Sequence, residues 1–112
     1  MSRRQQPEAQ IQRTIFEHFK IRSAPGVFAF HPPMGGWRSP VEAKILKGLG
    51  VTAGVPDIIA IKDGRTYGLE LKAENGKLSP AQIVAHSLLI SAGAQVAVAD
   101  NLDDALRWLE DR

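Results

Sequence analysis

The fold is decided by the stretch PDIIAIKDGRTYGLELK, residues 56–72. Two runs rich in Ile, Leu and Tyr, residues 56–62 and 66–72, flank the pair Asp63-Gly64. An Asp-Gly pair between two such runs is a strong short-range signal for a β-hairpin. We therefore predict two antiparallel strands joined by a two-residue turn.

The register of this hairpin brings charged side chains together. With a two-residue turn, Asp57 lies directly opposite Glu70. Directly opposed side chains share a face, with Cβ atoms about 4.5–5.5 Å apart. Lys72 is on the same face as Glu70, because side chains alternate along a strand. The sequence thus predicts two carboxylates and an amine on one side of the hairpin.

Two facing carboxylates repel each other unless a cation lies between them. Carboxylate oxygens are the ligands that Mg²⁺ and Mn²⁺ prefer, and such an ion can activate water and stabilise charge on a phosphoryl oxygen. Lys72 beside it would orient the water or neutralise the phosphate. The alternative is a solvent-facing side on which Glu70 simply pairs with Lys72. The spacing alone leaves both interpretations open.

Two helix starts flank the hairpin. Residues 39–42 read Ser-Pro-Val-Glu and residues 79–82 read Ser-Pro-Ala-Gln, and both patterns match the reciprocal capping box with proline at the first helical position. The first helix should reach about Leu49. The second should reach about Ala92, where Gly93 can provide a left-handed cap.

The remaining elements complete an α/β fold. Apolar residues from Ile11 to Phe19 recur at helical spacing after Pro7, which predicts a first helix to about Lys20. Residues 27–31 and 95–99 are predicted strands, and a closing helix begins near residue 100. Residues 66–72, 80–92 and 95–99 form a natural βαβ crossover. We predict a mixed β-sheet with helices on its faces.

Composition fits one small domain. The chain has 112 residues, expected to form a single domain over 1–112 with residues 1–6 as a loose tail. It has no cysteine, which excludes disulfides and thiolate metal sites and fits a cytoplasmic location. No apolar run is long enough to span a membrane, and the N-terminus has no signal-peptide pattern. The net charge of +2 is compatible with a polyanionic partner.

Three motifs together resemble a known family. They are Gly54-Val-Pro-Asp57, Gly68-Leu-Glu-Leu-Lys72 and the sequence GKLSPAQ at residues 76–82. The chain resembles the VRR-NUC domain of the PD-(D/E)XK nuclease superfamily, in the short stand-alone form of phages and bacteria. The resemblance runs from Glu8 through the last helix. It implies a restriction-endonuclease-like core with a site for Mg²⁺ or Mn²⁺, working in a bacterial or phage-infected cell.

The resemblance also implies roles for individual residues. Asp57 and Glu70 would be the metal ligands, with the Leu71 carbonyl completing the protein's contribution. Lys72 would be the catalytic lysine. None of these positions departs from the family pattern, so the resemblance implies an active enzyme.

Other polar residues have competing interpretations. By the resemblance, Glu8 would contact metal-bound water, although an acidic residue in a first helical turn also favours the helix dipole. Gln82 would act near the metal or substrate, although it also fits the capping box. His31, between a strand and two prolines, is predicted to be structural. His18 and His86 lack metal-ligand spacing with another histidine, so no histidine is predicted to bind the metal.

Basic residues near the motifs are candidate DNA contacts. Arg38, Lys44, Lys47 and Lys77 could meet phosphates, although lysines one turn apart usually mark a solvated helix face. Trp37 would either stack on an unpaired base or cover the core.

Taken together, the sequence predicts a metal-dependent endonuclease that hydrolyses DNA phosphodiester bonds. The chain resembles stand-alone domains that are dimeric and act on branched DNA. The resemblance therefore implies a homodimer that acts on four-way junctions. No membrane partner is expected. Two alternatives remain open: a nucleic-acid-binding module that has lost cleavage, and a small interaction protein with no nucleic-acid role.

Overall fold

The computed structural model describes residues 8–22, 26–32 and 39–110. Their elements follow in the order α1 (Glu8–Arg22), β1 (Val27–Phe30), α2 (Pro40–Gly48), β2 (Ile58–Lys62), β3 (Arg65–Leu71), α3 (Pro80–Ser91), β4 (Gln95–Ala99) and α4 (Leu102–Glu110). The predicted order is confirmed, and the bounds of β4 are those predicted. The largest shift in the hairpin is that β2 begins at Ile58, so Asp57 precedes the strand.

The sheet is mixed, as predicted. Its four strands lie in the order β1-β2-β3-β4, with β1–β2 and β2–β3 antiparallel and β3–β4 parallel. Lys62 pairs with Arg65, which confirms the predicted hairpin register. Asp63 and Gly64 both have positive φ, 53° and 74°, as a type I′ turn requires. The same register, carried one residue beyond β2, puts Asp57 opposite Glu70.

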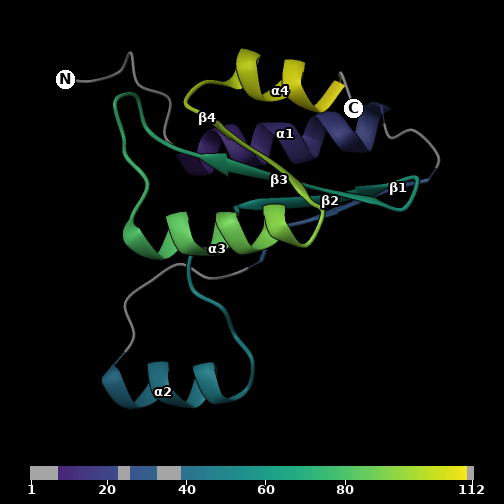
Figure 1. The fold of residues 1–112 in the computed structure, drawn as a ribbon. Coiled ribbons are helices and arrows are strands. Elements are labelled where there is room, and N and C mark those ends of the chain that lie inside the picture. The colour runs from purple at the N-terminus through teal and green to yellow at the C-terminus, as the bar shows by residue number, and fades with distance from the viewer. Residues whose placement is uncertain (1–7, 23–25, 33–38, 111–112) are drawn as a thin grey trace.

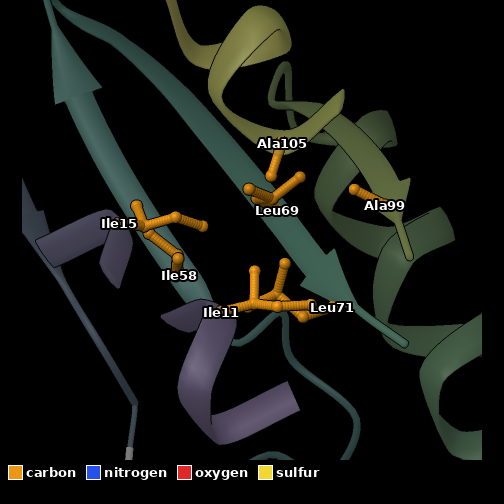
Figure 2. Packing of buried hydrophobic residues seen from close by; sticks show 7 residues of the cluster. All are labelled: Ile11, Ile15, Ile58, Leu69, Leu71, Ala99 and Ala105. Carbon is orange, nitrogen blue, oxygen red and sulfur yellow. The ribbon is translucent and has the colours of Figure 1, made fainter. Parts of the chain in front are cut away.

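Helices cover the two faces of the sheet. Figure 1 shows α1 and α4 over one face and α3 over the other. The core under α1 and α4 is the cluster in Figure 2, formed by Ile11, Ile15, Ile58, Leu69, Leu71, Ala99 and Ala105. Because strand side chains alternate, Leu69 and Leu71 point into this core while Glu70 points toward α3. The layers therefore place Glu70 between the sheet and α3.

Helix α2 does not follow the prediction that the helices lie on the sheet. None of its residues is buried, and Figure 1 shows it standing away from the sheet. Its start matches the predicted capping box in one half only: the Ser39 hydroxyl accepts a hydrogen bond from the Glu42 N–H. The Glu42 carboxylate accepts from that hydroxyl at 3.0 Å, in place of the Ser39 N–H that a reciprocal box requires. Its capping residues and apolar spacing predict a helix, but they carry no information about its packing partner. Val41, Ile45 and Leu49 remain 69%, 58% and 76% exposed, and we call them the α2 stripe.

Candidate metal centre

Asp57 is fixed by contacts on both sides. Its side-chain Oδ2 accepts a hydrogen bond of 2.8 Å from the backbone N–H of Leu71, across the hairpin. Its backbone carbonyl lies 2.6 Å from Nδ1 of His31, which follows β1. A carbonyl can only accept, so His31 donates this bond. His31 therefore acts on the position of Asp57 through the backbone.

Two glycines bring the loop before Asp57 into place. Gly54 has φ of +84°, and a Cβ there would lie 2.6 Å from the backbone nitrogen of Gln82, at the start of α3. A Cβ at Gly68 would lie 2.8 Å from Cγ of Pro56, which is fully buried. The loop therefore contacts the backbone of α3 at Gly54, and its Pro56 packs on the sheet at Gly68. Both close approaches set Asp57 beside the first turn of α3 and the end of β3.

Glu70 is the buried acid of the site, and the residue is only 2% exposed. Its pKa is raised to about 8, first by burial and then by a hydrogen bond and charge repulsion from Asp57. Lys72 opposes this rise in the pKa of Glu70, and Glu8 adds to it. The predicted set of three acids and one lysine is thus close enough to share one electrostatic environment.

Helix α3 holds both carboxylate oxygens of Glu70. Gln82 Nε2 donates to Glu70 Oε2 at 3.2 Å, and His86 Nε2 lies 3.0 Å from Glu70 Oε1. The other end of the same Gln82 amide accepts from the Ser79 N–H at 2.8 Å, and Ser79 Oγ accepts from the Gln82 N–H, so the predicted capping box is confirmed. Capping and contact with Glu70 are therefore compatible roles of one side chain.

The contact of His86 with Glu70 was not predicted from the sequence. No second histidine lies at metal-ligand spacing from His86, so no motif pointed to it. The available signal was its place four residues after Gln82, which puts both on one face of α3. His86 is only 6% exposed, and burial lowers its pKa, which favours the neutral imidazole.

Glu8 and Lys72 lie at the rim of the site. Glu8 Oε2 accepts a hydrogen bond of 3.0 Å from the Ala73 N–H, which joins the first turn of α1 to the chain just after β3. Glu8 is exposed and Lys72 is half-buried. Leu71 turns its side chain into the core, so only its backbone can take part in the site.

The donor set fits a Mg²⁺-like ion. In the part of the chain that the structure describes, no group of three or more His, Cys, Asp or Glu side chains is arranged to hold a metal. Mg²⁺ commonly takes only one or two protein carboxylates and keeps several waters. Asp57 and Glu70 match that requirement, and the Leu71 carbonyl stays a ligand that the resemblance predicts. A cation between the two acids would also remove the repulsion that raises the pKa of Glu70.

An open cavity of about 500 Å³ adjoins Asp57. It lies against α1 and is lined by Glu8, Ala9, Gln12, Arg13, Phe16, His31 and Asp57. Of the predicted DNA contacts, Lys44, Lys47 and Lys77 are exposed. Arg38 and Trp37 lie outside the described residues. The cavity adds Arg13, which the sequence did not single out.

Known structures share this fold. A solved "VRR_NUC domain protein" superposes with a TM-score of 0.76 and 23% identity, over 95% of this chain and 87% of that chain. A solved "VRR_NUC domain" gives a TM-score of 0.59 at 23% identity, over 92% of this chain and 94% of that chain. No protein-family model and no curated protein matches the sequence. The chain therefore has the restriction-endonuclease-like α/β fold of VRR_NUC domains, as its motifs predicted.

None of the helices in the described ranges is long and apolar enough to cross a membrane.

Proposed function

We propose that the protein is a nuclease that hydrolyses DNA phosphodiester bonds with Mg²⁺ or Mn²⁺. The observation that carries the proposal is the position of Glu70, a buried acid facing Asp57 with Lys72 beside it. Such an arrangement is unfavourable without a cation and favourable with one. The fold shared with VRR_NUC domains supports the same conclusion.

The chemistry divides among the residues of the site. A bound divalent ion supplies Lewis acidity and lowers the pKa of coordinated water. Asp57 and Glu70 would hold it, assisted by the Leu71 carbonyl. The Lys72 ammonium would orient the attacking water and neutralise the growing negative charge on the phosphate. Glu8, placed by its bond to Ala73, would orient water on the other side of the site.

The substrate strand would lie in the cavity beside Asp57. Gln12 and Arg13 offer hydrogen-bond donors along the wall formed by α1, and the ring of His31, just after β1, lines the same cavity. Arg13 is the cation of this wall and would contact a phosphate next to the one that is cleaved. Lys77, exposed just before α3, would be a further phosphate contact. These positions define a path for one strand past the carboxylates.

A cleavage assay tests the proposal. Linear duplex, flap and four-way-junction DNA would be incubated with Mg²⁺, with Mn²⁺ and with EDTA, beside an Asp57→Asn control purified in parallel. We expect cleavage only with metal and only by the unmodified protein. Binding of DNA without cleavage under every condition would instead favour a silent binding module. Absence of both DNA binding and DNA cleavage would favour a small interaction protein with no nucleic-acid role.

We further propose that the α2 stripe forms a homodimer interface. A nine-residue helix gains little stability from its own hydrogen bonds and needs packing, yet α2 buries no residue in its own chain. Contiguous exposed apolar surface commonly marks an interaction site. A second copy related by two-fold symmetry would cover the stripe and set two active sites at a fixed separation, which matches the symmetry of a four-way junction.

Substitution of one stripe residue checks this assembly. Ile45→Asp should convert the dimer to a monomer and reduce junction cleavage about tenfold or more, because a charge would then be buried in an apolar interface. Ala43→Asp makes the same charge change on the opposite side of α2 and should leave the dimer intact. Light scattering at micromolar concentration, beside the three-substrate assay, measures both effects. A wild-type monomer, or a dimer unaffected by Ile45→Asp, would contradict this interface.

A further inference from the structure

Helix α3 presents two polar side chains to a single carboxylate. Gln82 and His86 lie one helical turn apart, and each reaches a different oxygen of Glu70. The first turn of α3 is itself fixed by the capping box and by the close approach of Gly54 to its backbone. The start of α3 therefore fixes both side chains on one side of Glu70.

His86 is too deeply buried to touch a substrate. The residue is 6% exposed, and its hydrogen bond joins it to a Glu70 side chain that is buried as well. An ionised carboxylate can only accept hydrogen bonds, so His86 must carry its proton on Nε2 when Glu70 holds a cation. Any influence of His86 on the reaction has to pass through Glu70.

We propose that His86 is a positioning residue for the metal ligand Glu70, with Gln82 as its partner on the second oxygen. Each carboxylate oxygen can accept two hydrogen bonds or metal contacts. The donors on α3 occupy one side of each oxygen and leave the side toward Asp57 for the cation. This role rests on the proposed metal-dependent function.

The test compares variants of His86 by titration with Mn²⁺ alone, measured by calorimetry. His86→Leu removes the donor and should weaken Mn²⁺ binding about 10–100-fold, the usual cost of losing a partner that orients a metal ligand. His86→Gln keeps an amide donor near the position of Nε2 and should stay within a few-fold of wild type. Ser87→Leu, on the exposed side of α3, is the matched control and should bind Mn²⁺ normally.

Melting curves separate positioning from packing. A merely structural His86 would lower the melting temperature of His86→Leu equally in EDTA and in Mn²⁺, with an unchanged metal-induced shift and dissociation constant. That result would overturn the inference. The positioning role requires a smaller Mn²⁺-induced shift in His86→Leu than in wild type, restored in His86→Gln. If His86→Leu does not fold, His86→Asn, whose polar side chain is too short to reach Glu70, should show the same weakened binding.

The outcomes also separate this inference from the proposed function. If wild type binds Mn²⁺ and the folded donor-less variants bind it equally well, His86 has no positioning role while the metal site stands. If wild type binds no Mn²⁺, both the metal site and the role of His86 are refuted.

Discussion

Replacing Asp57 or Glu70 by alanine should abolish DNA cleavage and divalent-metal binding together. Asp57 and Glu70 are the two carboxylates that face each other, while the third acid, Glu8, lies at the rim and accepts a hydrogen bond from the Ala73 N–H, so neither facing acid has a substitute. Loss of the metal removes several kcal/mol of transition-state stabilisation, which corresponds to about a thousandfold or more in rate. Calorimetric titration with Mn²⁺ and single-turnover cleavage measure the two losses on the same preparations.

Lys72→Ala provides the contrast within the same site. It should keep Mn²⁺ binding and lose about 100–1,000-fold in rate, as expected when one charge-stabilising group is removed. Lys62→Ala, at the far end of the same hairpin, removes an equal charge and should change little. Full activity in Asp57→Ala or Glu70→Ala would refute the site. A folded Lys72→Ala that no longer binds metal would show that the lysine has a different role.

Without metal, the free energy of unfolding should fall as pH rises from about 4.5 to about 8. Folding raises the pKa of Glu70 to about 8 from its ordinary value of 4.5, so the folded state binds this proton more tightly than the unfolded state. Stability from the protonated acid is complete below about pH 4.5 and is lost as pH rises through 8. A tenfold difference in proton affinity between the two states corresponds to about 1.4 kcal/mol. Thermal melts in EDTA should therefore show a loss of roughly 10 °C or more for a chain of this size.

Glu70→Gln is the control for this pH dependence, because its amide cannot ionise. Its stability advantage over wild type should grow between pH 5 and pH 8.5 in EDTA. At high pH, Mn²⁺ should make wild type more stable than Glu70→Gln. An ion that binds only the folded form raises the melting temperature of the protein that binds it, and the variant should not bind it. Equal metal-induced shifts in both proteins would place the ion elsewhere.

The hairpin could be predicted because its information is local. Asp63-Gly64 specifies a type I′ turn, the turn specifies the register, and the register places Asp57 opposite Glu70. The strand Val27–Phe30 was also predicted, but its pairing with β2 was not. That contact joins residues distant in the chain, so no local pattern encodes it. The isolation of α2 was missed for the same reason, since spacing defines an apolar stripe without defining what covers it.

Within the site, the hairpin residues were placed by periodicity, while contacts between elements were not. His86 reaches Glu70 only because α3 packs on one particular face of the sheet at one particular rotation. Glu8 reaches Ala73 because α1 crosses the opposite face. The resemblance identified Glu8 and Gln82 as candidate site residues but did not show which atoms they contact. His86 belongs to no motif that the sequence analysis used, and only its spacing from Gln82 indicated that it lies at the site.

The close approach of Gly54 to α3 offers a criterion for recognising related chains. An acid, a second acid and a lysine at suitable spacing occur by chance in many sequences, whereas a position where any side chain meets helix backbone excludes every amino acid except glycine. A chain that keeps the three charged residues but carries a side chain at the equivalent of Gly54 cannot seat its loop in this way. Diagnosis of this site in distant sequences should therefore weigh the glycine as heavily as the acids.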